Sequence, residues 1–177
     1  MVAVSSPPKG TKTTILTATT PASAEPTRPV FSPHETQLVD ATNLIVGRLA
    51  SYVAQQLLHG YSITILNAEN AVFTGNPKIL AKLWHTRLDL RPKGNPEFGP
   101  RFSCMPDRIV RKIVEGMVPS KSERGRNALK RLRVYIGTPA HLSGKKTQAL
   151  VSAQNHKTKG ITSVKELAQT LGYHLRV

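Results

Sequence analysis

The feature that most restricts the fold lies in residues 38–66, where a stretch of helical periodicity separates two short apolar stretches. Residues 38–41 (LVDA) predict a short strand. In GRLASYVAQQLLHG, large apolar residues recur at helical spacing, and Gly60 ends the run. Residues 63–66 are apolar and β-rich, which predicts a strand buried on both faces. A strand, a helix and a strand in this order form a right-handed βαβ unit, so we expect an α/β domain around a mostly parallel sheet.

The middle of the chain predicts two amphipathic helices. The first, in PKILAKLWHTRL, begins at Pro77, and its apolar face comprises Ile79, Leu80, Leu83 and Trp84. The second, in MPDRIVRKIVEGMVP, has Asp107 near its positive N-terminal end, and its apolar face comprises Ile109, Val110, Ile113, Val114 and Met117. The stretch between them, DLRPKGNPEFGPRF, has neither a helical nor a strand period and predicts a basic loop.

The last third of the chain predicts two shorter helices. In KSERGRNALKRLRVYIG we expect a loop, a short helix bearing Leu129 and Leu132, and a strand at residues 133–136. Residues 138–160 are polar. In ITSVKELAQTLGYHL we expect a final helix capped by Thr162 or Ser163, with inward residues Val164, Leu167, Ala168 and Leu171.

Residues 1–37 differ in composition from the rest of the chain. They are rich in Thr, Ser, Pro and Ala and contain few large apolar side chains, so we expect an extended or disordered arm. Three basic residues oppose two acids there, which leaves a charge of about +1. The arm also lacks the continuous apolar segment of an export signal, and we expect no membrane-spanning segment.

The net charge indicates the class of partner. The chain has 25 Lys and Arg residues against 10 Asp and Glu, a formal charge of +15, which favours a polyanionic partner. Aromatic residues make up only 5% of the chain, so phosphate contacts to folded RNA are favoured over stacking on single strands. Between residues 78 and 133, fifteen Lys and Arg residues oppose five acids. We therefore expect RNA contact there, against the alternative of a solvated surface.

The candidate RNA-binding residues are the Lys and Arg side chains of the predicted basic helices and loops. They are Arg48, Lys78, Lys82, Arg87, Arg91, Lys93, Arg101, Arg108, Arg111, Lys112, Lys121, Arg124, Arg126, Lys130, Arg131, Arg133, Lys145 and Lys146. We refer to these eighteen as the candidate basic residues.

The span around Gly125 permits two interpretations. Gly125 lies among Arg124, Arg126 and Arg131, and its missing Cβ would allow a phosphate to approach main-chain amides. Alternatively, Gly125 only turns the chain before a helix. We expect the three arginines to act on RNA and to contribute little to the stability of the free domain.

Three ordered blocks resemble one protein family. They are GRLAS at residues 47–51, NAENAVFTGN at residues 67–76 and GMVPSKSERGRNALKRLRVYIGTP at residues 116–139. Together they resemble the L13 family of large-subunit ribosomal proteins over residues 38–142, and the spacing of PDRIVRKIVEGMVP and the RGR form resemble its archaeal and eukaryotic branch. The resemblance assigns RNA-facing positions to Arg48, Lys82, Arg108, Lys112, Lys121, Arg124, Arg126, Lys130 and Arg133.

The resemblance also sets expectations for architecture and function. It implies a three-layer α/β domain at residues 38–142, with residues 1–37 as an extended N-terminal arm and residues 143–177 as a basic C-terminal extension carrying a short helix. It implies a cytoplasmic structural protein of the large ribosomal subunit that contacts large-subunit ribosomal RNA and neighbouring ribosomal proteins and supports subunit assembly. It implies no catalysis. We also expect no cofactor, metal, membrane partner or small-molecule substrate. The arm has no counterpart in the compact family pattern.

Other functions fit the sequence less well. GTPAHLSGKKT at residues 137–147 has six residues between its glycines, and Lys146 replaces the Ser or Thr of a P-loop, which disfavours a phosphate-binding enzyme. The six histidines show no paired metal-ligand spacing. Asp40 is interpreted as a turn or capping acceptor rather than a catalytic carboxylate, and Cys104 as a packed thiol. A free-standing RNA-binding translational regulator remains the alternative.

Overall fold

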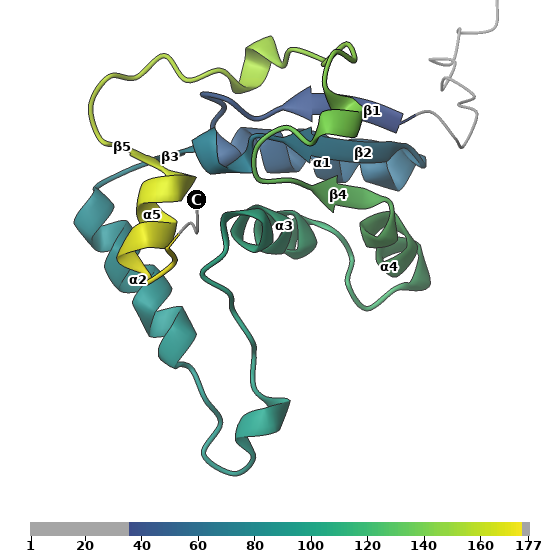
Figure 1. The fold of residues 1–177 in the computed structure, drawn as a ribbon. Helices are drawn as coiled ribbons and strands as arrows, with labels where there is room; N and C mark the ends of the chain where they lie inside the picture. Colours follow the sequence, from purple (N-terminus) through teal and green to yellow (C-terminus); the bar gives the residue numbers. More distant parts are fainter. Residues whose placement is uncertain (1–35, 175–177) are drawn as a thin grey trace, which may run out of the picture. The chain divides into compact units, whose positions relative to one another are not determined.

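A computed structural model describes residues 36–174, which form an α/β domain (Figure 1). The central sheet has three parallel strands in the order β1 (Thr36–Asp40), β2 (Ser62–Leu66) and β4 (Leu132–Val134). This confirms the expected α/β fold around a mostly parallel sheet. Of the arm predicted for residues 1–37, only Thr36 and Gln37 lie within the described residues, and they begin β1.

Helix α1 (Val46–His59) connects β1 to β2, as the periodicity predicted. It buries Leu49, Val53 and Leu57 on one face. Gly60 ends the helix with a φ of 107°, and its amide donates to the carbonyls of Gln56 and Leu57. A left-handed C-cap of this kind strongly favours glycine because any side chain there would be strained.

The connection from β2 to β4 is long and contains most of the basic residues. It passes through strand β3 (Val72–Thr74) and then through the helices α2 (Pro77–Asp89), α3 (Pro106–Met117) and α4 (Glu123–Lys130). The side chain of Asn76 accepts a hydrogen bond from the amide of Lys78 at the start of α2, and Ser122 does the same for Gly125 in α4. These N-caps begin helices whose outer faces carry Lys and Arg.

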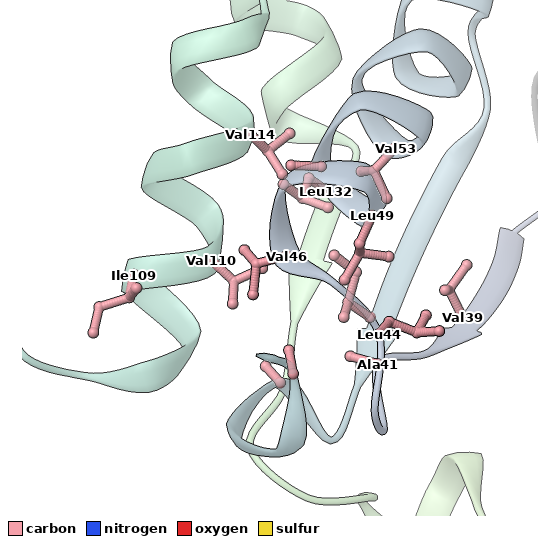
Figure 2. Close-up of a cluster of buried hydrophobic side chains, with 14 of the residues drawn as sticks. Val39, Ala41, Leu44, Val46, Leu49, Val53, Ile109, Val110, Val114 and Leu132 are labelled. Carbon is pink, nitrogen blue, oxygen red and sulfur yellow. The ribbon is translucent and has the colours of Figure 1, made fainter. Parts of the chain in front are cut away.

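The main core lies between α1, α3 and one face of the central sheet. Figure 2 shows Leu49 and Val53 of α1 lying near Val114 of α3 and Leu132 of β4. All four are almost completely buried. Helices α1 and α3 are therefore fixed to the sheet and to each other, so the side chains on their outer faces have defined positions.

The chain after residue 142 adds to the same core. Strand β5 (Ile161–Ser163) pairs antiparallel with β3, and helix α5 (Val164–Thr170) follows it. Of the two expected caps, the structure uses Ser163. Its Oγ accepts from the amide of Glu166 at 3.1 Å, and the Glu166 carboxylate accepts from the Ser163 amide at 3.2 Å. The four expected inward residues of α5 are buried.

One helix boundary was predicted wrongly, and other details were not predicted. Leu132 lies in β4 rather than in the preceding helix. On α2 only Trp84 is buried, whereas Ile79 is 66% exposed and Leu83 44% exposed. Met117 at the end of α3 is also exposed. Periodicity identifies an apolar face but not whether another element covers it. Strands β3 and β5 were not predicted because each has only three residues.

Asp40 stabilises the turn after β1, which confirms its interpretation as a turn acceptor. Its Oδ1 accepts hydrogen bonds from the amide of Thr42 at 3.0 Å, the Thr42 hydroxyl at 2.7 Å and Nδ2 of Asn67 at 3.0 Å. Burial by itself raises the pKa of Asp40, but these hydrogen bonds outweigh it, so the pKa lies below its ordinary value of 3.8. The turn therefore stabilises the ionised form of the Asp40 side chain.

We expect Asp40→Ala to lower the free energy of unfolding by about 1 kcal/mol at neutral pH, because three hydrogen bonds to the carboxylate are lost. A carboxyl group whose pKa is lower in the folded than in the unfolded protein contributes its full stabilisation above the unfolded pKa. This contribution is lost as the pH falls through the folded pKa. The difference between wild type and variant, measured by urea unfolding, should thus shrink only in the acid range below pH 3.8. A difference that stays constant across that range would show that the ionised carboxylate has no special role.

Candidate nucleic-acid interface

The candidate basic residues lie on helices α1, α2, α3 and α4, on strand β4 and on the loops around them. All of them are exposed except Arg131, which is half-buried. Their exposure follows from the packing, since the apolar faces of α1 and α3 point inward and the Lys and Arg positions point outward. Exposure alone does not distinguish side chains that bind RNA from side chains that only contact water. The hydrogen bonds within the domain show which of these side chains already have a partner.

Two of the candidate basic residues bind the C-terminal end of α1. Arg131 donates from Nη2 to the carbonyl of Leu57 at 2.8 Å, and Arg124 donates from Nη2 to the carbonyl of Leu58 at 3.1 Å. The last carbonyls of a helix lack partners within the helix, and cations near this end are favoured by the helix dipole. These two arginines therefore connect α4 and the start of β4 to α1, and these bonds predict a contribution to stability where the sequence predicted little.

Arg111 and Arg48 make similar connections elsewhere. Arg111 donates to the carbonyl of Leu129 at 3.3 Å and to the carbonyl of Leu132 at 3.4 Å, which joins α3 to the end of α4 and to β4. Arg48 donates to the carbonyl of Ser152 at 3.3 Å, which joins α1 to the C-terminal part of the chain. A guanidinium has five N–H donors, so each of these side chains retains donors for an external oxygen.

Gly125 has a structural role that neither sequence interpretation included. A Cβ built on Gly125 would lie 2.1 Å from the carbonyl oxygen of Pro119, so no larger residue fits without moving the backbone. Its amide already donates to Oγ of Ser122 at 3.3 Å. The group that lies close to Gly125 is thus the Pro119 carbonyl rather than a phosphate. The Gly125 amide is already hydrogen-bonded and is not free to bind a phosphate.

The remaining basic side chains have little internal charge compensation. Within residues 36–174 there is one salt bridge, from Lys112 Nζ to Glu115 at 3.1 Å, and both side chains are exposed. An exposed pair of this kind contributes about 0–1 kcal/mol and is screened by salt. In that described part, no hydrogen bond or ion pair is made by the side chains of Lys78, Lys82, Arg91, Lys93, Arg108, Lys121, Arg126, Lys130, Arg133, Lys145 and Lys146.

Four of the candidate basic residues meet at one cavity. The cavity has a volume of about 450 Å³ and lies beside α3, where Arg101, Arg108, Arg111 and Lys112 line it. Trp84 and Phe102 form its apolar part, with ring centroids 6.5 Å apart in an edge-to-face arrangement. Two acids, Asp107 and Glu115, also line it. The structure does not bring Arg48, Lys145 or Lys146 to this cavity.

Sequence reasoning missed the contacts between cations and aromatic rings. The guanidinium of Arg87 lies 5.1 Å from the ring centroid of Trp84, and Nζ of Lys112 lies 5.8 Å from that of Phe102. Such contacts orient the cations while leaving their outer sides exposed. The pair of Trp84 and Arg87 was visible in the sequence, because residues three apart on a helix share a face. The pair of Lys112 and Phe102 was not, because the loop geometry brings it together.

The described residues contain neither a cluster of metal ligands nor a membrane-spanning helix. Within residues 36–174, no group of three or more His, Cys, Asp or Glu side chains is placed to hold a metal ion. In the same residues, no helix combines the length and apolarity needed to cross a membrane. Cys104 is half-buried and packs against the core.

The fold and its exposed charge define an α/β protein with a strongly basic surface. The family model for ribosomal protein L13 matches residues 34–141, which is more than half of the chain. Curated relatives agree over most of the length. The chain is 38% identical to large ribosomal subunit protein uL13 of Methanopyrus kandleri over 149 residues, covering 81% of this chain and 91% of that protein. The chain belongs to the L13 family of ribosomal proteins.

Two other relatives have the same description. Large ribosomal subunit protein uL13 of Thermoplasma volcanium is 37% identical over 136 residues, which cover 77% of this chain and 98% of that protein. That of Methanosarcina barkeri is 44% identical over 117 residues, covering 66% of this chain and 81% of that protein. These relatives are archaeal, in agreement with the branch that the motif spacing indicated.

The geometry predicts different effects for two arginines that lie five residues apart. Arg131→Ala should lower the free energy of unfolding by about 1–2 kcal/mol, because it removes the bond to the Leu57 carbonyl and a half-buried side chain. Arg126→Ala should change it by less than about 0.5 kcal/mol, because the Arg126 side chain is exposed and makes no hydrogen bond or ion pair within the described residues. Chemical denaturation of both variants measures this difference. Equal stability losses would show that the bond to α1 does not hold the fold.

Proposed function

We propose that this chain is a structural component of the large ribosomal subunit, where it binds folded large-subunit ribosomal RNA and supports assembly of the subunit. The observation that carries the proposal is the imbalance of charge. Between residues 78 and 133, fifteen basic side chains oppose five acids, and the described part of the chain forms a single exposed salt bridge. Positive charge that the protein leaves uncompensated favours a partner rich in phosphates.

The arrangement suits RNA of defined shape. The exposed Lys and Arg side chains stand on helices that the core fixes in place, and several arginines are further oriented by backbone carbonyls. Contacts to phosphates fix the position and orientation of a protein on RNA without reading its sequence. The basic residues would therefore bind the backbone of one folded RNA region and add rigidity to it.

Membership of the L13 family supports the assignment to the ribosome. The relatives in Methanopyrus kandleri, Thermoplasma volcanium and Methanosarcina barkeri are described as large ribosomal subunit proteins. On this proposal the chain acts in the cytoplasm within the large subunit, its partners are ribosomal RNA and neighbouring large-subunit proteins, and it has no catalytic role. The carboxylate that sequence analysis considered for catalysis, Asp40, is used by the turn after β1.

Binding to ribosomal RNA should weaken steeply with salt. A protein that neutralises about six to ten phosphates loses about 10³- to 10⁵-fold in affinity between about 50 and 200 mM salt, because binding releases counterions from the RNA. Filter binding or fluorescence anisotropy with protein-free large-subunit ribosomal RNA measures the slope. An affinity that changes less than about tenfold over this range would contradict binding through phosphates.

A further inference from the structure

Phe98 carries an exposed ring that makes no aromatic contact within the described residues. Phe98 is 88% exposed, whereas the other Phe, Tyr and Trp side chains of residues 36–174 are buried or half-buried. The free domain gains no hydrophobic stabilisation from a ring in this position. The packing of the domain explains the position of the buried aromatic side chains, but it does not explain the position of Phe98.

The ring lies on an ordered turn far from the core. Figure 1 shows the chain between α2 and α3 extending away from the central sheet, and the turn Pro96–Phe98 lies on this extension. The amide of Glu97 donates to the side chain of Asn95 at 3.0 Å, and Arg101 Nη2 donates to the carbonyl of Glu97 at 3.5 Å. These local bonds restrict the backbone of the turn, which lowers the conformational entropy lost when Phe98 binds a partner.

The surroundings of Phe98 are basic and apolar at once. Arg91, Lys93 and Arg101 share its loop with one acid, Glu97. Arg91 and Arg101 also line a cavity of about 320 Å³ beside the loop, together with Phe102 and the end of α2. Four of the six large exposed apolar side chains of residues 36–174 lie on α2 and this loop, namely Ile79, Leu83, Leu90 and Phe98, whereas Met117 and Val151 lie elsewhere. A partner that fits must present flat apolar surface next to negative charge.

Unpaired RNA bases have this combination of properties. The faces of a base stack on aromatic rings, and the phosphates of the same strand lie within reach of neighbouring cations. We propose that Phe98 stacks on an unpaired base of ribosomal RNA while Arg91, Lys93 and Arg101 contact the adjacent phosphates. This inference rests on the proposed RNA-binding function and deepens it, because the scarcity of aromatic residues had favoured phosphate contacts over stacking.

Stacking and charge contacts differ in their dependence on salt. Stacking releases no counterions, so loss of the Phe98 ring lowers affinity by the same factor at each salt concentration. Loss of Arg91 or Lys93 removes a phosphate contact and reduces the salt slope. Stacking is also tolerant of base identity, so Phe98 selects an unpaired nucleotide rather than a particular base.

The test compares Phe98→Leu, Phe98→Ala and Phe98→Tyr in the full chain, with protein-free large-subunit ribosomal RNA as the ligand. Phe98→Leu and Phe98→Ala should both weaken binding by about 5- to 150-fold with an unchanged salt slope, because leucine lacks a stacking face. Phe98→Tyr should bind within about threefold of wild type, because it keeps the ring. Val151→Ala, which removes another strongly exposed apolar side chain, is the matched control and should bind as wild type does.

Chemical probing of the bases supplies a second readout. An unpaired base protected by the wild-type protein should become reactive in the complex with Phe98→Leu at saturating protein. The inference is overturned if Phe98→Leu binds as tightly as wild type, since an apolar contact of the kind made with a protein partner would then suffice. It is also overturned if the base protections are unchanged. If the wild-type chain itself shows no salt-dependent binding to ribosomal RNA, the proposed function fails first, which distinguishes the two outcomes.

Discussion

The parallel pairing of β1, β2 and β4 determines where the rest of the chain must go. Parallel neighbours need crossovers, and in this domain α1 and α3 serve as crossover helices that pack on each other and on the sheet. Because the inward faces of these helices are apolar, their Lys and Arg residues lie outside. The long connection between β2 and β4 carries most of the basic residues. The topology that buries the core therefore also places these residues on the surface.

Arginine has two roles in this domain. Arg111, Arg124 and Arg131 donate to backbone carbonyls and join α1, α3, α4 and β4, whereas Arg126 and the exposed lysines make no such bonds in the described residues. A guanidinium has enough N–H donors to bind a backbone carbonyl and still donate to an external oxygen. On the proposed function, these arginines would couple stability to RNA binding, so each binding measurement on their variants needs a stability measurement beside it.

The sequence was sufficient to predict the βαβ unit, the end of α1 at Gly60 and the final helix, because these follow from local periodicity and capping. It did not show that Ile79 and Leu83 remain exposed while Trp84 of the same face is buried, since within residues 36–174 the packing covers only part of that face. It also did not show that Gly125 receives the Pro119 carbonyl or that Arg131 reaches α1, because both contacts depend on tertiary packing. The charge pattern identified the candidate basic residues, but it did not show which of them also form hydrogen bonds between elements of the fold.

The central claim is that this chain is a constituent of the large ribosomal subunit rather than a free RNA-binding regulator. Gradient fractionation of a lysate, with the chain followed by immunoblot, tests it most directly. We expect the chain to sediment with the large subunit in stoichiometric amount and to remain with it in moderate salt. A chain found only in the soluble fraction, with large subunits that lack it, would contradict the claim.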